Sequence, residues 1–145
     1  VIGAYITEEV AGLQGAALQI KLRRLDAGNE ARRRHAAQYT QLLSGVKGVI
    51  TPTVADYGVP VFHLYVIRVA ERDRVLAAMG QRGIGCAIHY PKPVHLQKAY
   101  ASLGYKPGSF PVAERTAPEL LSLPMFPELT PAQVELVVKE LKAVL

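Results

Sequence analysis

Residues 61–69 read VFHLYVIRV, a run rich in β-branched and aromatic residues. Such residues favour a β-strand, and strand alternation places His63, Tyr65, Ile67 and Val69 on one face. We predict that this run is the central strand of a sheet. A histidine on such a face is more often a hydrogen-bonded part of the core than a ligand, so His63 is a secondary candidate only.

Helical patterns lie on both sides of this strand. Residues 7–44 contain no proline and repeat apolar residues at helical intervals, which predicts one long helix or two in tandem. Thr7 is the expected N-cap, and Gly28-Asn29 is the expected kink or break. Gly12 and Gly15 lie three apart on the apolar side, where they either allow another element to approach closely or are simply tolerated.

The remaining segments complete an α/β pattern. Residues 71–81 predict a helix, 84–88 a strand, 95–103 a short helix and 112–121 a helical stretch across a proline. Residues 121–127 predict a brief edge strand or a packed loop. Thr130 and Pro131 begin a last amphipathic helix as N-cap and first residue. We expect a two-layer α/β small domain, with a small, mostly antiparallel sheet packed by helices and entered by a long N-terminal helix.

Composition limits the classes of function. A chain of 145 residues fits one domain, and its one cysteine, Cys86, excludes an internal disulfide and favours a cytoplasmic setting. No apolar run reaches the length of a membrane span, about 18 residues, so we expect no membrane partner. The net charge of +5 is concentrated in residues 21–35, where acidic residues are interleaved. A solvated helix face is the preferred interpretation; receipt of an anionic small ligand and nucleic-acid binding are alternatives.

The segment of residues 85–97, GCAIHYPKPVHLQ, is the candidate site. Two prolines, Pro91 and Pro93, prevent a regular helix or sheet ladder, so the rings of His89, Tyr90 and His95 lie on a stiffened loop after a predicted strand. Scaffolded loops of this kind often carry ligand contacts. A rigid connector whose rings merely pack explains the spacing equally well.

Two other chemistries are disfavoured at this segment. A zinc site built on Cys86, His89 and His95 lacks a second ligand cluster and a usual spacing, so we expect no metal. A nucleophilic Cys/His pair is also disfavoured, because strand alternation points Cys86 and His89 to opposite faces.

Ordered blocks along nearly the whole chain carry a family resemblance. The blocks are Leu13-Gln14, Ala16, Lys21-Leu22, Leu25-Asp26, Asn29-Glu30, Arg32-Arg33, Ala37, Tyr39, His63 to Arg68, His89-Tyr90-Pro91, His95-Leu96-Gln97, Ala99-Tyr100, Leu103-Gly104-Tyr105, Phe110 to Glu114 and Leu121 to Pro127. Together they resemble the C-terminal small domain of the DegT/DnrJ/StrS class of pyridoxal-phosphate sugar aminotransferases, which have fold type I. The first blocks are similar to the helix that joins the two domains of that class.

The resemblance implies a function for a larger parent protein. Residues 1–145 would be its small domain, with 1–45 as the inter-domain helix and 46–145 as the α/β core, and with the large cofactor-binding domain absent. The parent would be a cytoplasmic homodimer that moves an amino group, from glutamate, to a keto-sugar nucleotide in deoxyaminosugar or polysaccharide biosynthesis. Pyridoxal phosphate would be held as a Schiff base by a lysine of the large domain, so we expect no catalytic residue in this chain and an inactive fragment.

The resemblance also implies individual roles. The His-Tyr-Pro loop of the family borders the nucleotide-sugar pocket, so His89 and Tyr90 are expected to contact the pyrophosphate or sugar, with Lys92 and His95 as electrostatic helpers. Each of the four residues also has a purely structural interpretation, and His95 in particular could simply begin a helix.

One departure concerns the cofactor. The family shows Gly-x-Asn-x-Arg before Leu-Gln, with the asparagine on the cofactor phosphate of the partner subunit, and the matching positions here are Tyr5, Thr7 and Glu9. Thr7 is therefore the one cofactor-binding candidate. The charge reversal at Glu9 supports an alternative, a non-catalytic binding or regulatory domain of the same fold.

Overall fold

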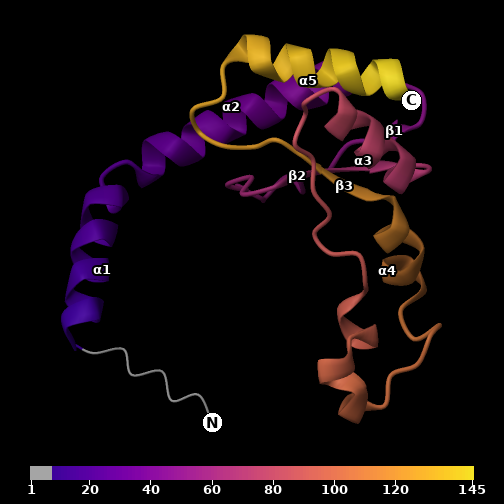
Figure 1. The fold of residues 1–145 in the computed structure, drawn as a ribbon, viewed down its shortest axis with the longest axis horizontal. Helices are drawn as coiled ribbons and strands as arrows, with labels where there is room; N and C mark the ends of the chain where they lie inside the picture. The colour runs from indigo at the N-terminus through magenta and orange to yellow at the C-terminus, as the bar shows by residue number, and fades with distance from the viewer. Residues whose placement is uncertain (1–7) are drawn as a thin grey trace.

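The computed structural model describes residues 8–145 as a small sheet covered by helices, with two long extensions (Figure 1). The helices are α1 (Glu8–Leu22), α2 (Leu25–Leu43), α3 (Arg72–Gln81), α4 (Pro111–Thr116) and α5 (Pro131–Val144). Three short 3₁₀ helices are η1 (Val94–Leu96), η2 (Lys98–Leu103) and η3 (Ala117–Glu119). The strands are β1 (Val49–Ile50), β2 (Tyr65–Val69) and β3 (Leu120–Leu123).

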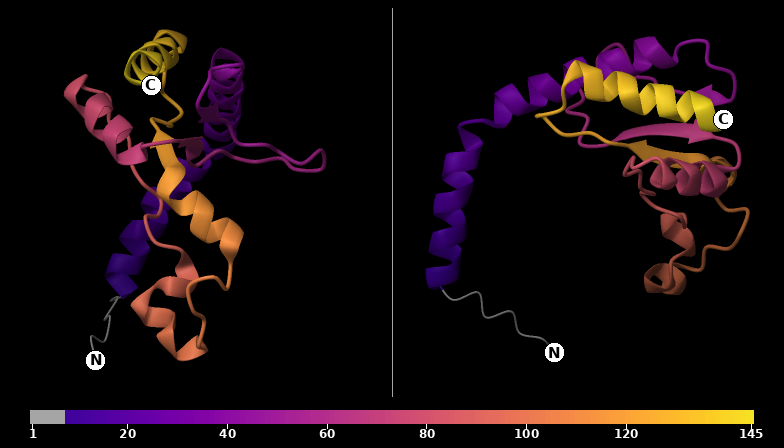
Figure 2. Two further views of the ribbon diagram at one scale, coloured as in Figure 1. Left: turned by 90° about the vertical axis from the view of Figure 1, so that its right-hand side faces the viewer. Right: turned by 45° about the horizontal axis from the view of Figure 1, so that its top comes forward.

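The sheet is antiparallel, in the order β1-β2-β3, with β2 in the centre. In its register, Tyr65 lies opposite Leu123 and Arg68 opposite Leu120. Figure 2 shows α3, α5 and α2 side by side over one face of these strands. The expected α/β fold with a small antiparallel sheet is confirmed, and so is the central position of the strand.

The central strand is shorter than predicted. Tyr65, Ile67 and Val69 share its buried face as expected, but His63 is exposed and precedes the strand. Phe62 has a φ of 48°, in the left-handed region that a bulky residue rarely adopts, and this conformation interrupts the extended chain before Tyr65. The prediction that His63 belongs to the strand face was wrong.

The core joins α2 to the central strand. The rings of Tyr39 and Tyr65 stack with centroids 5.0 Å apart, and both residues are fully buried. The Tyr39 hydroxyl donates to the Pro124 carbonyl at 3.0 Å, and the Tyr65 hydroxyl lies 2.7 Å from Thr40 Oγ1. Aromatic pairs of this kind stabilise beyond the area they bury, and each buried hydroxyl has its partner. Around the pair lie the other fully buried large side chains: Leu43, Ile67, Met79, Leu121, Leu141, Val69, Val75 and Val134.

The N-terminal helical region is two helices in tandem, one of the two alternatives. The break lies at residues 23–24 and not at Gly28-Asn29, so the predicted position was wrong. Gly28 lies inside α2 because the chain after β3 packs against it: a Cβ on Gly28 would come within 3.3 Å of Pro127 Cγ. The glycine allows a close approach instead of a break. The N-cap expected at Thr7 lies outside the described residues.

Helix α1 extends away from the core (Figure 1). Leu13, Leu18, Ile20 and Leu22 are exposed on it. A Cβ added at Gly12 or Gly15 would meet nothing within 4 Å. In the described part of the chain, therefore, no element makes the close approach that these glycines would allow. In addition, none of the helices in residues 8–145 is long and apolar enough to cross a membrane.

The segment predicted as a strand at residues 84–88 pairs at one residue only. Ala87 and Ser122 form an isolated antiparallel bridge beside β3. The amides of Ile84 and Cys86 instead donate to the carbonyls of Met79 and Ile84, so they do not join a ladder. The prediction of a full strand here was wrong.

Four other expectations concern the second half of the chain. The short helix expected at 95–103 is two 3₁₀ helices, and the helical stretch ends at Glu119, because the following residues enter β3. For residues 121–127, both alternatives hold in part: β3 is a brief strand, and the residues after it are a packed loop. Thr130 and Pro131 begin α5 as predicted, with a capping box between Thr130 and Gln133.

The two isoleucines of the sheet allow a matched test of this core. Ile67 is fully buried in β2, whereas Ile50 in β1 is 54% exposed. Ile67→Ala should lower the free energy of unfolding by about 2–5 kcal/mol, because it removes buried methyl groups and leaves a cavity. Ile50→Ala should change it by about 0.5 kcal/mol or less. Urea unfolding measures both, and equal effects would contradict the assignment of Ile67 to the core.

Candidate functional site

The candidate site lies at the base of a protruding segment. Residues 91–116, here named the arm, leave the core and contain η1, η2 and α4 (Figure 1). The arm and α1 extend from the core in the same general direction, as Figures 1 and 2 both show. His89 and Tyr90 immediately precede the arm, and the bridge between Ala87 and Ser122 fixes them to the sheet.

His89 and Tyr90 differ in their surroundings. The His89 ring is half-buried, and its Nδ1 lies 2.9 Å from the hydroxyl oxygen of Ser122. Tyr90 is 67% exposed, and its ring meets the His89 ring edge-on, with centroids 5.7 Å apart. The peptide bond between the two residues is cis. The pair therefore presents a phenol and part of an imidazole at the surface of the described chain, where a larger ligand could reach them.

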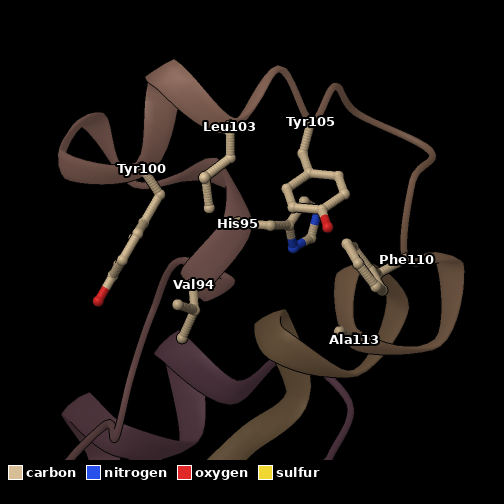
Figure 3. A pocket seen from close by; sticks show the side chains of 7 residues that line it. All are labelled: Val94, His95, Tyr100, Leu103, Tyr105, Phe110 and Ala113. Atoms are coloured by element: carbon tan, nitrogen blue, oxygen red, sulfur yellow. The ribbon is translucent and has the colours of Figure 1, made fainter.

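His95 lies inside the arm. Its side chain is 8% exposed, its Nε2 lies 3.0 Å from Glu114 Oε1, and its ring packs on Phe110 with centroids 4.7 Å apart. The Tyr105 ring also meets the imidazole edge-on and packs against Phe110, with ring centroids 6.4 Å and 5.1 Å away, as Figure 3 shows. These contacts give His95 a structural place that ties η1 to α4. The expectation that it assists substrate binding remains a prediction.

The Glu114 carboxylate organises the turn of the arm. It accepts hydrogen bonds from the backbone amides of Gly108 and Phe110, at distances of 2.8–3.1 Å, besides the one from His95. The pKa of Glu114 is lowered, first by the amide of Gly108, then by that of Phe110 and by His95. Hydrogen bonds to the charged form favour ionisation, so the carboxylate is charged at neutral pH.

An apolar hollow of about 460 Å³ lies beside this cluster (Figure 3). Its lining residues are Val94, His95, Tyr100, Leu103, Tyr105, Phe110 and Ala113. Most of these side chains are apolar or aromatic, so the hollow suits the packing of hydrophobic groups and offers few polar anchors for a sugar.

The other candidates are placed as follows. Lys92 is exposed, and within residues 8–145 it makes no ion pair. Burial raises the pKa of the Cys86 thiol to about 11, so it is protonated at neutral pH and a poor nucleophile. No group of metal-ligating side chains is found in the part of the chain that the structure describes. Thr7 lies outside that part, so its expected cofactor contact is a prediction.

The comparison with protein families decides the relationship. The family model described as the DegT/DnrJ/EryC1/StrS aminotransferase family matches residues 9–142. The chain belongs to this family. The resemblance carried by the sequence blocks is thereby confirmed.

Individual members of the DegT/DnrJ/EryC1/StrS family are similar in sequence and fold. A "pleiotropic regulatory protein" of Geobacillus stearothermophilus is 47% identical over 131 residues, which cover 89% of this chain and 35% of that protein. A dTDP-3-amino-3,4,6-trideoxy-alpha-D-glucose transaminase of Streptomyces venezuelae is 42% identical over 117 residues, which cover 81% of this chain and 31% of that protein. The crystal structure of S. venezuelae DesV with a ketimine intermediate superposes with a TM-score of 0.84 at 39% identity. The superposition covers 90% of this chain and 35% of DesV. The chain thus spans about a third of the length of these relatives.

No lysine of the chain is buried in the described structure. All seven lysines of the chain are exposed, whereas a lysine that forms a Schiff base is activated by desolvation or by a neighbouring cation.

Two residues of the site were missed from sequence, Ser122 and Glu114. Ser122 interrupts an apolar run in β3, and a lone hydroxyl on a buried strand signals a specific polar partner. Glu114 lies in the first turn of α4, where acidic residues are common. The neighbouring sequence does not indicate that its carboxylate also accepts hydrogen bonds from the backbone of the preceding turn.

The lowered pKa of Glu114 predicts how the arm responds to acid. A carboxyl with a depressed folded pKa stabilises the structure above its unfolded pKa, and this contribution is lost as the pH falls through the folded value. The amide resonances of Gly108 and Phe110 should therefore titrate with a midpoint below the ordinary glutamate value of about 4.3. Two-dimensional NMR from pH 7 to 3 measures this.

The control for this titration is Glu114→Gln, in which the group cannot ionise and both amide transitions should disappear. A midpoint at or above the ordinary glutamate value would contradict the role of Glu114 as an ionised clamp of the arm.

Proposed function

We propose that this chain is the C-terminal small domain of a pyridoxal-phosphate-dependent aminotransferase. The whole protein would transfer an amino group from glutamate to a keto-sugar nucleotide in deoxyaminosugar or polysaccharide biosynthesis, as a homodimer in the cytoplasm. The observation that carries the proposal is the family match over residues 9–142. The names of relatives such as the S. venezuelae dTDP-sugar transaminase and a UDP-N-acetyl-3-dehydro-glucosamine 3-aminotransferase of Acidithiobacillus ferrooxidans support the substrate class.

The surface of α1 supports the domain assignment. Several large apolar side chains on it are exposed, and monomeric proteins rarely leave such a row uncovered. Because the relatives are about three times longer than this chain, the remaining two thirds of the parent would cover α1 and supply the Schiff-base lysine. Residues 1–45 would then join the two domains, and residues 46–145 would form the rest of the small domain.

The proposed contacts of the substrate lie at the base of the arm. His89 and Tyr90 would donate hydrogen bonds to oxygens of the pyrophosphate or sugar, because both rings reach the surface beside each other. Lys92, exposed two residues later, would add a positive potential for the anionic substrate. His95 would act on the substrate indirectly, by holding the arm against Glu114.

A second candidate is a non-catalytic binding or regulatory domain. It is favoured by the similarity to a protein named as a pleiotropic regulatory protein, and by Thr7 and Glu9 at the positions of the family asparagine and arginine. In the transaminase proposal, Thr7 would instead donate a hydrogen bond to the cofactor phosphate of the partner subunit. Absence of turnover by the whole protein with every nucleotide keto-sugar tested would favour this second candidate.

Variants of the whole protein test the proposed contacts. His89→Ala and Tyr90→Phe should each raise KM for the nucleotide sugar about tenfold or more, because each removes a hydrogen bond to a charged or polar ligand group. The control is Tyr57→Phe, the same chemical change at a tyrosine that is 93% exposed and lies outside the arm. Steady-state kinetics measures all three, and unchanged KM values for both site variants would contradict the assignment.

A further inference from the structure

We propose that Ser122 is a positioning residue for His89, which fixes the proton of the neutral imidazole on Nε2 and so presents a hydrogen-bond donor to the substrate. The inference rests on the proposed function of His89. Ser122 lies in β3, and its side chain would act on the substrate only through the imidazole of His89.

The hydroxyl and the imidazole are held together by the backbone. Ser122 is 3% exposed, and its Oγ lies 2.9 Å from His89 Nδ1. Two residues before His89, Ala87 forms two hydrogen bonds with the backbone of Ser122, at 2.8 and 3.1 Å. On its other side, Ser122 lies opposite Val66 in the ladder between β2 and β3. The strand that carries the hydroxyl is therefore fixed on both sides, and so is the start of the segment that carries the imidazole.

The direction of the hydrogen bond follows from the number of protons. A serine hydroxyl has one proton to donate, and His89 Nδ1 is its only hydrogen-bond partner within residues 8–145. If Nδ1 carried a proton and donated it to Oγ, the buried hydroxyl proton would lack an acceptor, which is costly in a protein interior. The hydroxyl therefore donates, and Nδ1 accepts.

Because Nδ1 accepts a hydrogen bond, the protonation state of the other ring nitrogen, Nε2, is also determined. In a neutral imidazole one nitrogen carries the proton and the other accepts, so Nε2 of His89 carries it. Within the described chain, Nε2 forms no hydrogen bond. A neutral N–H donor fits ligands rich in acceptor oxygens, such as a pyrophosphate or the hydroxyl and carbonyl oxygens of a keto-sugar. The buried hydroxyl also restrains rotation of the ring, so less conformational freedom is lost when the ligand binds.

The first test reads the tautomer directly. The chain labelled with ¹⁵N-histidine is studied by long-range ¹H–¹⁵N correlation NMR at pH 8, where imidazoles of ordinary pKa are neutral. His89, assigned from the spectrum of His89→Gln, should show a protonated Nε2 and an unprotonated Nδ1. A protonated Nδ1 in the unsubstituted chain would overturn the proposal, and this result does not depend on whether any variant at position 122 folds.

The second test removes the hydroxyl. Ser122→Ala should shift His89 toward a mixture of tautomers and, in the whole protein, raise KM for the nucleotide sugar about fivefold, as expected for the loss of one hydrogen bond that acts through the ring. Ser122→Thr, which keeps a hydroxyl on a β-branched side chain suited to a strand, should restore both readouts. Ser44→Ala, at an exposed serine outside the sheet and the arm, is the matched control and should change neither.

The combined results separate this inference from the proposed function. If His89→Ala raises KM but Ser122→Ala changes neither the tautomer nor KM, Ser122 is not a positioning residue and the proposed function is retained. If the tautomer behaves as expected but His89→Ala leaves KM unchanged, Ser122 still fixes the ring, and the proposed role of His89 in substrate binding is wrong.

Discussion

The stacked pair of Tyr39 and Tyr65 is the contact on which the rest of the molecule depends. It joins α2 to the central strand, and the Tyr39 hydroxyl also holds the Pro124 carbonyl just after β3. Burial raises the pKa of both phenols, so both hydroxyls stay protonated at neutral pH. Because β3 pairs with β2 on one side and with Ala87 on the other, the same contact determines where the sheet ends and where His89 emerges.

The arm is braced separately from this core. The Glu114 carboxylate accepts hydrogen bonds from the amides of Gly108 and Phe110 and from His95. Aromatic rings pack against the imidazole of His95. The protein thus uses its two imidazoles after residue 85 differently. His89 has one ring nitrogen bonded to Ser122 of the sheet and no hydrogen bond at the other within residues 8–145, whereas His95 is enclosed within the arm. A substrate-binding surface at the base of the arm would be held on one side by the sheet and on the other by this cluster.

The sequence predicted the fold better than the details of the site. Regular periodicity and capping residues located α3, α5 and β2, because these elements bury one continuous face each. The errors arose where a distant contact decides the outcome. Gly28 is a close-packing glycine because Pro127 lies on it, and residues 84–88 fail to form a strand because two of their amides are used locally. His89 and Tyr90 were identified through the family resemblance, whereas the partners Ser122 and Glu114 depend on contacts across 33 and 19 residues, which spacing does not reveal.

We propose that His89 and Tyr90 contact an anionic sugar nucleotide in a site that the rest of an aminotransferase completes. A crystal structure of the whole protein with a bound nucleotide sugar tests it most directly. We expect His89 Nε2 within hydrogen-bond distance of a ligand oxygen, about 2.7–3.2 Å, and the Tyr90 hydroxyl beside the same ligand. A ligand bound elsewhere, with both rings covered by protein and out of its reach, would contradict the account.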